Sequence, residues 1–170
     1  IQEDLPIDSF LLSQYAIGFD TLLHYYKSDT IQEFAIADKF VEHASWSTKK
    51  APPYVIKAND LLATTLSSNR IRYGITATNS GFYGPQGREL RAVIENYNFL
   101  DKLMSFKHEE LKITNLEMET SGIYGLSTLL GHQSVSLNCI LANRKTGEFS
   151  ANPNKAVDAL IKYTLDKLTA

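Results

Sequence analysis

The sequence predicts an α/β fold, in which helices cover a sheet. Three observations predict it. Segments with strand periodicity alternate with segments of helical periodicity over the last two-thirds of the chain. Each of these predicted strands runs into polar or turn-forming residues, as is typical where a strand gives way to a loop. The 170 residues are 44% hydrophobic and 21% charged, which suffices for one packed domain, and we find no internal repeat.

The first 70 residues predict a strand, a partly helical stretch and one clear helix. Short apolar segments broken by turn residues favour a strand at residues 8–13. Residues 30–45 are expected to be partly helical, and the lysine and proline pairs of residues 47–53 indicate a surface connection. Helical spacing of apolar residues predicts a helix over 58–66, which the polar residues 67–69 close.

The central part of the chain predicts two strands and two helices. Residues 71–78 alternate between apolar and polar side chains and therefore predict a strand. A helix is expected over residues 98–106, followed by a strand over 111–116. The apolar spacing of Ile123, Leu126 and Leu130 then predicts a further helix.

The last part of the chain predicts one more strand and a closing helix. Alternation over residues 135–141 predicts the strand, which ends in polar residues and a glycine turn. Asn152 is a favourable N-cap and Pro153 suits the first helical position. The apolar stripe that follows, up to Leu168, predicts an amphipathic helix that packs on the rest of the domain.

Composition and charge exclude several classes of protein. The net charge of −2 gives no broad basic field for nucleic acid, and no run approaches the ~18 apolar residues of a membrane span. We therefore expect a soluble protein that binds neither nucleic acid nor membrane. Cys139 is the only cysteine, so no intrachain disulfide can form, and a reducing cytoplasm is the expected location. The four histidines lack metal-ligand spacing, so no metal site is expected.

Three loops that follow predicted strands carry ligand-capable side chains. They are residues 82–88, 117–119 and 143–144. In open α/β sheets ligands bind beyond the carboxyl ends of the strands, so we expect the three loops to meet over one ligand. Backbone N–H groups at the helix start near residues 117–119 are expected to be free for that ligand.

The side chains of these loops suit a nucleoside. Phe82 and Tyr83 offer flat apolar faces, and Gln86 can donate and accept hydrogen bonds on a heterocycle. When a C–N glycosidic bond breaks, the sugar becomes cation-like and the base anion-like. A guanidinium at a base oxygen, such as that of Arg88, then stabilises the transition state more than the ground state. Glu119 would hold the sugar hydroxyls and favour positive charge nearby.

Each of these residues also has a simpler interpretation. Acids at a helix start complement the helix dipole. The two aromatic residues and Met118 could be core residues, and Gln86 and Arg88 could lie in a solvated loop. The order in which the motifs occur favours the functional interpretation.

Three motifs together resemble a known family. GITATNSGFYGPQGR, then NLEMETSG, then NCILANR are similar to the nucleoside phosphorylase superfamily and, within it, to the uridine phosphorylases, whose pattern is FYxxQxR, an EMES-like stretch and VNR. The first 26 residues also resemble the region after the family's phosphate-binding turn. The resemblance implies a three-layer fold with a mixed central sheet flanked by helices. Residues 1–170 would be the C-terminal portion of a single such domain, and an N-terminal portion is expected to precede the first residue, which is not methionine.

The activity implied by the resemblance is the phosphate-dependent cleavage of a pyrimidine nucleoside, such as uridine, to the free base and ribose 1-phosphate. Inorganic phosphate would be a co-substrate and no cofactor is expected. A homo-oligomer is expected, because this family assembles and commonly completes its sites with a neighbour's residues.

The resemblance also implies roles for individual residues. Gln86 and Arg88 match the residues that recognise uracil, and Phe82 matches an aromatic beside the nucleoside. Met118 and Glu119 match residues that hold the ribose, and Glu117 matches the first acid of the same motif. Asn143 stands where purine-specific relatives place an acid, and Arg144 would support the loop of Asn143. A neutral amide at position 143 is consistent with specificity for pyrimidine nucleosides.

The chain departs from the family pattern in three respects. Gly84-Pro85 reverses the usual order and Gly87 replaces a common acid, which leaves the path of that loop open, and Thr120 replaces a serine. The family's phosphate-binding glycine loop and arginines would lie upstream, so these residues alone are expected to be inactive without that N-terminal portion. Three alternatives remain: a purine nucleoside phosphorylase, a nucleosidase of the same superfamily, or a non-catalytic nucleoside-binding module.

Overall fold

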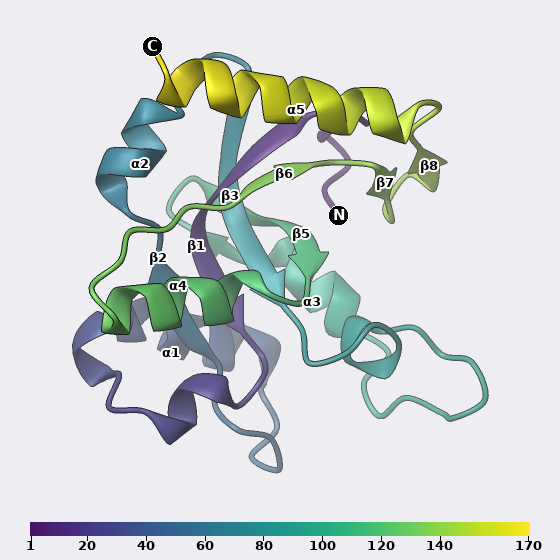
Figure 1. Ribbon diagram of the computed structural model, residues 1–170. Helices are drawn as coiled ribbons and strands as arrows, with labels where there is room; N and C mark the ends of the chain where they lie inside the picture. The colour runs from purple at the N-terminus through teal and green to yellow at the C-terminus, as the bar shows by residue number, and fades with distance from the viewer.

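The computed structural model describes residues 1–170 and is built around a six-stranded sheet, which is mixed, as the family resemblance implies (Figure 1). The strand order is β2-β1-β3-β5-β4, and β6 also pairs with β1. The bounds of these strands are β1 Phe10–Gly18, β2 Tyr54–Lys57, β3 Ile71–Thr78, β4 Lys107–His108, β5 Leu111–Glu117 and β6 Leu137–Cys139. β1, β3 and β5 are parallel, whereas β2, β4 and β6 are antiparallel to their neighbours. A separate hairpin joins β7 (Ala142–Asn143) to β8 (Glu148–Phe149).

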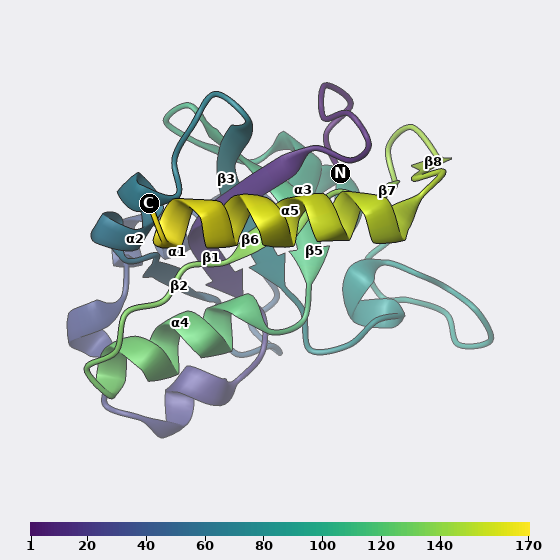
Figure 2. The ribbon, with the colours of Figure 1, turned by 45° about the horizontal axis from the view of Figure 1, so that its top comes forward.

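Helices cover both faces of the sheet. They are α1 Phe34–Ala44, α2 Asp60–Thr65, α3 Phe99–Ser105, α4 Thr120–Leu129 and α5 Pro153–Leu168, with short 3-10 turns η1 Leu22–Tyr25, η2 Asp29–Ile31 and η3 Gly84–Gln86. α1 and α3 pack on one face, and α4 and α5 lie on the other, α5 crossing in front of β1 and β6 (Figure 2). No helix is both long and apolar enough to cross a membrane.

The alternation of side chains along β1 builds two core layers. Ile17 packs with Phe40 of α1 and Leu103 of α3 on one face. The preceding residue, Ala16, faces the opposite layer, which contains Tyr124 of α4. Each of these large side chains is fully buried, which contributes about 1.5–3 kcal/mol per side chain. The two faces together give the expected layering of helix, sheet and helix.

The central elements match the sequence prediction, and the short strands do not. β3 occupies the predicted residues 71–78, and α5 begins at Pro153 with the Asn152 side chain accepting a hydrogen bond from the Lys155 N–H at 3.2 Å. β1 is longer than the predicted strand over 8–13, because its second half pairs with β2 and β3. β2 was not predicted, since four residues after a proline pair carry almost no periodic signal.

The direction of β6 corrects the expected meeting of three strand ends. The ends of β3 and β5 do meet, because the Asn79 N–H donates to the Glu117 carbonyl at 2.8 Å. β6 runs the other way: Leu137 pairs with Leu12 and Cys139 with Phe10. The chain therefore leaves β6 beside the start of β1, and residues 140–144 do not extend from the sheet edge at which β3 and β5 end.

Candidate active site

A cavity of about 240 Å³ brings the three predicted loops together. Gln86 and Arg88 reach it from the loop after β3, Glu117 from the end of β5, and Arg144 from the segment after β6. The cavity lies between β5 and the segment that leaves β6, rather than at a common edge of parallel strands. Four of the predicted site residues therefore share one cavity, although they are far apart in the sequence.

A tight turn places the base-recognition residues. Residues Gly84–Gln86 form one 3-10 turn, which the Gly87 N–H closes by donating to the Gly84 carbonyl at 2.9 Å. Gly87 has a φ of +70°, a left-handed conformation that a residue without Cβ adopts at little cost. The turn buries Gln86, which is 4% exposed, and returns the chain so that Arg88 reaches the same cavity. The structure thus gives the path of this loop, which could not be predicted from the sequence because the order Gly84-Pro85 is the reverse of the family pattern.

Arg88 is held in place by the loop that carries it. Its Nη1 donates to the Gln86 Oε1 and to the Phe82 carbonyl, both at 2.6 Å. Its guanidinium lies over the Phe82 ring, 3.9 Å from the ring centroid. Arg88 and Gln86 are therefore prearranged as one unit. The amide nitrogen of Gln86 and the remaining guanidinium N–H groups of Arg88 have no hydrogen-bond partner in the chain.

The two aromatic residues of the motif lie outside this cavity. Phe82 is 52% exposed, and its ring face contacts Arg88. Tyr83 packs edge-on against Phe82 and lines a different, larger cavity. Phe82 thus orients the guanidinium.

Arg144 adds a second guanidinium. Its Nη1 donates to the Gln86 carbonyl at 2.6 Å, so it supports the 84–88 turn from the opposite side. Burial and the nearby Arg88 charge lower the pKa of Arg144 below its ordinary value, yet an arginine remains charged at neutral pH. Neither guanidinium forms a salt bridge. This end of the cavity is therefore suited to a group that gains negative charge.

Glu117 serves the fold. Its Oε2 accepts hydrogen bonds from the N–H groups of Glu119 and Thr120, both at 2.7 Å, and from the Thr120 hydroxyl at 2.9 Å. Its Oε1 accepts from the Thr78 hydroxyl at 2.5 Å, and that hydroxyl in turn accepts from the Ser121 N–H at 2.9 Å. The N–H groups of Glu119, Thr120 and Ser121 at the start of α4 are therefore not free for a ligand, contrary to expectation, because a carboxylate and a hydroxyl group of the chain already bind them.

Met118 and Glu119 line an open depression beside the small cavity. Both are exposed, Met118 by 42%, and Asp20 and Leu22 form part of the same depression. The Glu119 Oε2 accepts from the Met118 N–H at 3.2 Å, and its Oε1 has no partner in the chain. Glu117 stands between the two hollows, because it lines the cavity and binds the Glu119 N–H. The structure therefore does not place Glu119 in the same cavity as Gln86 and Arg88.

Asn143 points away from the cavity, contrary to the expectation that it faces the base. Its side chain is buried, and its Nδ2 donates to the carbonyls of Gln2 and Leu5 at 2.8 and 3.0 Å. Its Oδ1 accepts from the Lys145 N–H at 3.0 Å. Asn143 thus ties the first residues of the chain to the hairpin of β7 and β8. Both its amide nitrogen and its amide oxygen are hydrogen-bonded within the chain, as buried polar groups usually are, so neither is available to a base.

The sequence analysis missed two asparagines that line the cavity. Asn115 accepts hydrogen bonds at its Oδ1 from the Thr76 and Thr114 hydroxyls, which leaves its amide nitrogen unpaired. Asn138 donates from its Nδ2 to Ser13 and Ser136 hydroxyls, which leaves its carbonyl oxygen unpaired. The sequence held one signal for Asn115 and Asn138: each is a polar amide within a predicted, largely apolar strand.

Comparisons with solved structures identify the fold. A Trypanosoma brucei nucleoside phosphorylase, described as showing uridine phosphorylase activity, superimposes with a TM-score of 0.84 and 25% identity over 99% of this chain. A uridine phosphorylase of the oomycete Phytophthora capsici gives a TM-score of 0.63 and 16% identity over 97% of this chain. The chain spans 60% of the length of each. No protein-family model matches it, and a search of curated proteins finds no match. The resemblance to nucleoside phosphorylases is thus confirmed in the structure.

Proposed function

We propose that this protein cleaves a pyrimidine nucleoside, uridine or a close analogue, with inorganic phosphate to give the free base and ribose 1-phosphate. The observation that carries the proposal is the small cavity in which Gln86, Arg88 and Arg144 meet, in a chain with a nucleoside phosphorylase fold. Phosphate-binding residues supplied by a preceding portion of the protein, or by a neighbouring copy in a homo-oligomer, would complete the site.

The small cavity suits a base more than a whole nucleoside. Its volume of about 240 Å³ is below the roughly 300–1,000 Å³ of sites that hold drug-sized ligands. Uracil presents two carbonyl oxygens with an N–H between them. Gln86 can donate to one oxygen from its nitrogen and accept the ring N–H at the second lone pair of its Oε1, while Arg88 donates to the other oxygen. A base held in this way leaves the sugar outside the cavity.

The two guanidiniums would assist departure of the base. As the glycosidic bond lengthens, the electron pair moves onto the ring and its oxygens. Arg88 and Arg144 have no carboxylate partner to neutralise them, so their field favours the departing anion. One preorganised donor of this kind typically lowers the activation barrier by about 2.7–4 kcal/mol, which raises the rate roughly 10²–10³-fold. Arg88 would act directly on the base oxygen, and Arg144 would hold the turn that carries Gln86.

The sugar would lie across Met118 toward Glu119. Because Glu117 is already bonded to four donors of the chain, it is unavailable to the sugar. Glu119 is exposed beside it with one free carboxylate oxygen, which can accept from a ribose hydroxyl. Its negative charge also favours the cation-like sugar from which the base departs, and phosphate would then bond to the anomeric carbon.

Incubating uridine with purified protein that includes the proposed phosphate-binding portion, with and without phosphate, tests the proposal. Chromatography should find uracil and ribose 1-phosphate only when phosphate is present. Inosine, a purine nucleoside, is the matched comparison substrate and should react much more slowly. Free ribose formed without phosphate would indicate a nucleosidase instead. Saturable binding of uridine without turnover at any phosphate concentration would indicate a non-catalytic binding module.

A further inference from the structure

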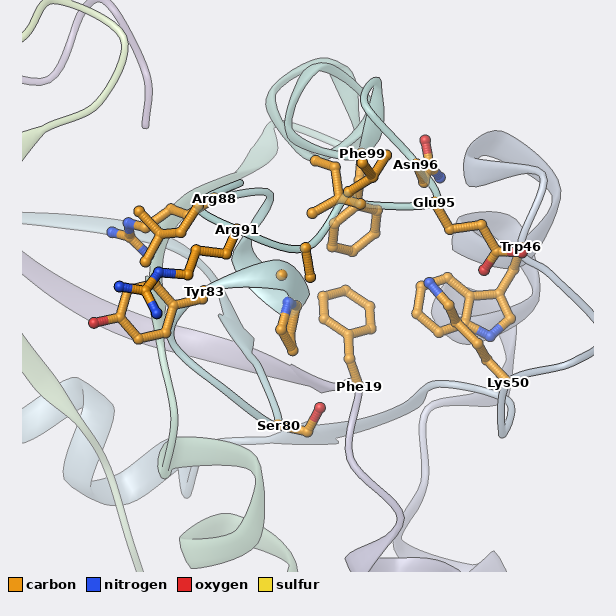
Figure 3. Close-up of a pocket in the computed structure, with 16 residues that line it drawn as sticks. Phe19, Trp46, Lys50, Ser80, Tyr83, Arg88, Arg91, Glu95, Asn96 and Phe99 are labelled. Atoms are coloured by element: carbon orange, nitrogen blue, oxygen red, sulfur yellow. The ribbon is translucent and has the colours of Figure 1, made fainter.

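A second and larger cavity lies on the other side of the 80–88 loop. Its volume is about 500 Å³, and it is bounded by Phe19 after β1, Trp46 after α1 and Phe99 at the start of α3 (Figure 3). The loop between β3 and α3 closes its remaining side. Neither the proposed base site nor the proposed sugar site uses this cavity, although Arg88 lines both it and the small cavity.

Three aromatic rings form one wall of this cavity. The rings of Phe19 and Trp46 are stacked at a centroid distance of 5.2 Å and an angle of 25°. Phe99 meets Phe19 edge-on at 5.4 Å. Flat ring faces and edges arranged in this way favour contact with a further planar ring. The wall therefore selects for an aromatic or heteroaromatic ligand.

Positive charge lines the same cavity. The Lys50 Nζ lies 5.3 Å from the Trp46 ring centroid and 5.8 Å from that of Phe99. Arg91 stands on the other side, close to Arg88 and Tyr83 (Figure 3). Neither Lys50 nor Arg91 forms a salt bridge, whereas the one lining carboxylate, Glu95, already pairs with Lys49 at 3.5 Å. The cavity therefore carries an excess of positive charge over its aromatic wall.

We propose that this cavity binds a planar aromatic anion, with the ring against Phe19, Trp46 and Phe99 and its negative charge in the field of the two cations, Lys50 on one side and Arg91 on the other. The volume of about 500 Å³ falls within the usual range for a small-molecule site. This cavity adjoins the proposed nucleoside site, with which it shares Ser80 and Arg88, but its occupation does not depend on the proposed activity. A nucleotide and an aromatic carboxylate share the required chemistry.

The only tryptophan of the sequence, Trp46, reports directly on this site. Naphthalene-2-sulfonate and naphthalene-2-sulfonamide form a matched pair of probes that differ in charge. The sulfonate should quench Trp46 emission saturably, and calorimetry should give about tenfold tighter binding than for the sulfonamide, because the anion is attracted by two cations that each contribute up to about 1 kcal/mol. Adenosine 5′-monophosphate and benzoate, each titrated separately against Trp46 emission, then distinguish a nucleotide from an aromatic carboxylate by which binds more tightly.

Substitutions of exposed residues locate the charge. Lys50→Met and Arg91→Gln should each weaken sulfonate binding about fivefold and leave sulfonamide binding unchanged. Lys155→Met is the control, because Lys155 is exposed on α5, forms no salt bridge and does not line the cavity, and this variant should bind the sulfonate as the parent does. Equal affinity for the two naphthalene probes, unchanged sulfonate binding in both test variants, or no saturable quenching by any anionic probe would overturn the proposal. All these readouts are binding measurements, so a failure of nucleoside cleavage does not affect them.

Discussion

Replacing Glu117 by glutamine tests whether this residue serves the fold or the substrate. The carboxylate bonds four donors across two elements: the Thr78 hydroxyl at the end of β3, and the N–H groups of Glu119 and Thr120 together with the Thr120 hydroxyl at the start of α4. Glutamine has nearly the same shape but no charge. Its amide nitrogen cannot accept the hydroxyl hydrogen that Oε1 accepts.

The magnitude follows from these contacts. Hydrogen bonds to a charged group contribute about 1.5–3 kcal/mol, and neutral ones about 0.5–1.5 kcal/mol, so each of the three bonds to Oε2 weakens by about 1 kcal/mol. Loss of negative charge at the N-terminus of α4 removes roughly another 0.3–1 kcal/mol. Because Glu117 is only half-buried, solvent recovers part of this loss, and we expect the free energy of unfolding to fall by about 2–3 kcal/mol.

Equilibrium unfolding in urea, followed by far-UV circular dichroism and by Trp46 fluorescence, measures this loss. Glu110→Gln is the matched control, because Glu110 is exposed and makes no side-chain hydrogen bond; its unfolding midpoint should not shift. A Glu117→Gln midpoint indistinguishable from that of the control would refute the structural role. A variant with unchanged stability and a raised KM for uridine would instead indicate that Glu117 binds the substrate.

Three further predictions concern the proposed site. Arg88→Ala should lower kcat for uridine about 10²–10³-fold while raising KM less than about tenfold. Arg70→Ala is the control, because Arg70 is an exposed arginine outside both cavities, and it should change neither kcat nor KM. A kcat loss below about threefold in Arg88→Ala would argue against Arg88 as the group that stabilises the negative charge on the departing base. Glu119→Gln should impair uridine more than 2′-deoxyuridine, and equal losses would exclude a contact with the 2′-hydroxyl. Uracil should slow alkylation of Cys139, which lines the small cavity. Burial and the Asp8 charge raise the pKa of that thiol, so alkylation should also slow about tenfold per pH unit below the pKa; unchanged alkylation at saturating uracil would count against the base position.

Local sequence patterns predicted the elements whose stability depends on their own residues. The alternation of residues 71–78 predicted β3, since Ile75 and Ala77 pack in the core on one face, whereas the threonines on the other face make side-chain hydrogen bonds. Asn152 and Pro153 predicted the start of α5 because capping involves only neighbouring residues. The motif around Gln86 and Arg88 predicted a recognition loop, and the structure places both side chains in one cavity.

Features set by distant contacts could not be predicted in this way. β2 is four residues long and depends on pairing with β1, and the antiparallel direction of β6 depends on a partner more than a hundred residues earlier in the chain. The two acids of the EMET motif look alike in sequence, yet Glu117 is occupied by Thr78 from another strand while Glu119 remains exposed. Asn143 likewise turns toward backbone carbonyls near the start of the chain, which no local pattern indicates.

A crystal structure of the protein with uracil and phosphate tests the central claim most directly. The account predicts a planar ring in the small cavity, with one ring oxygen about 2.7–3.2 Å from a guanidinium nitrogen of Arg88 and the Gln86 amide on the same ring edge. Uracil bound elsewhere, or a small cavity that stays without a ring at saturating uracil, would contradict it.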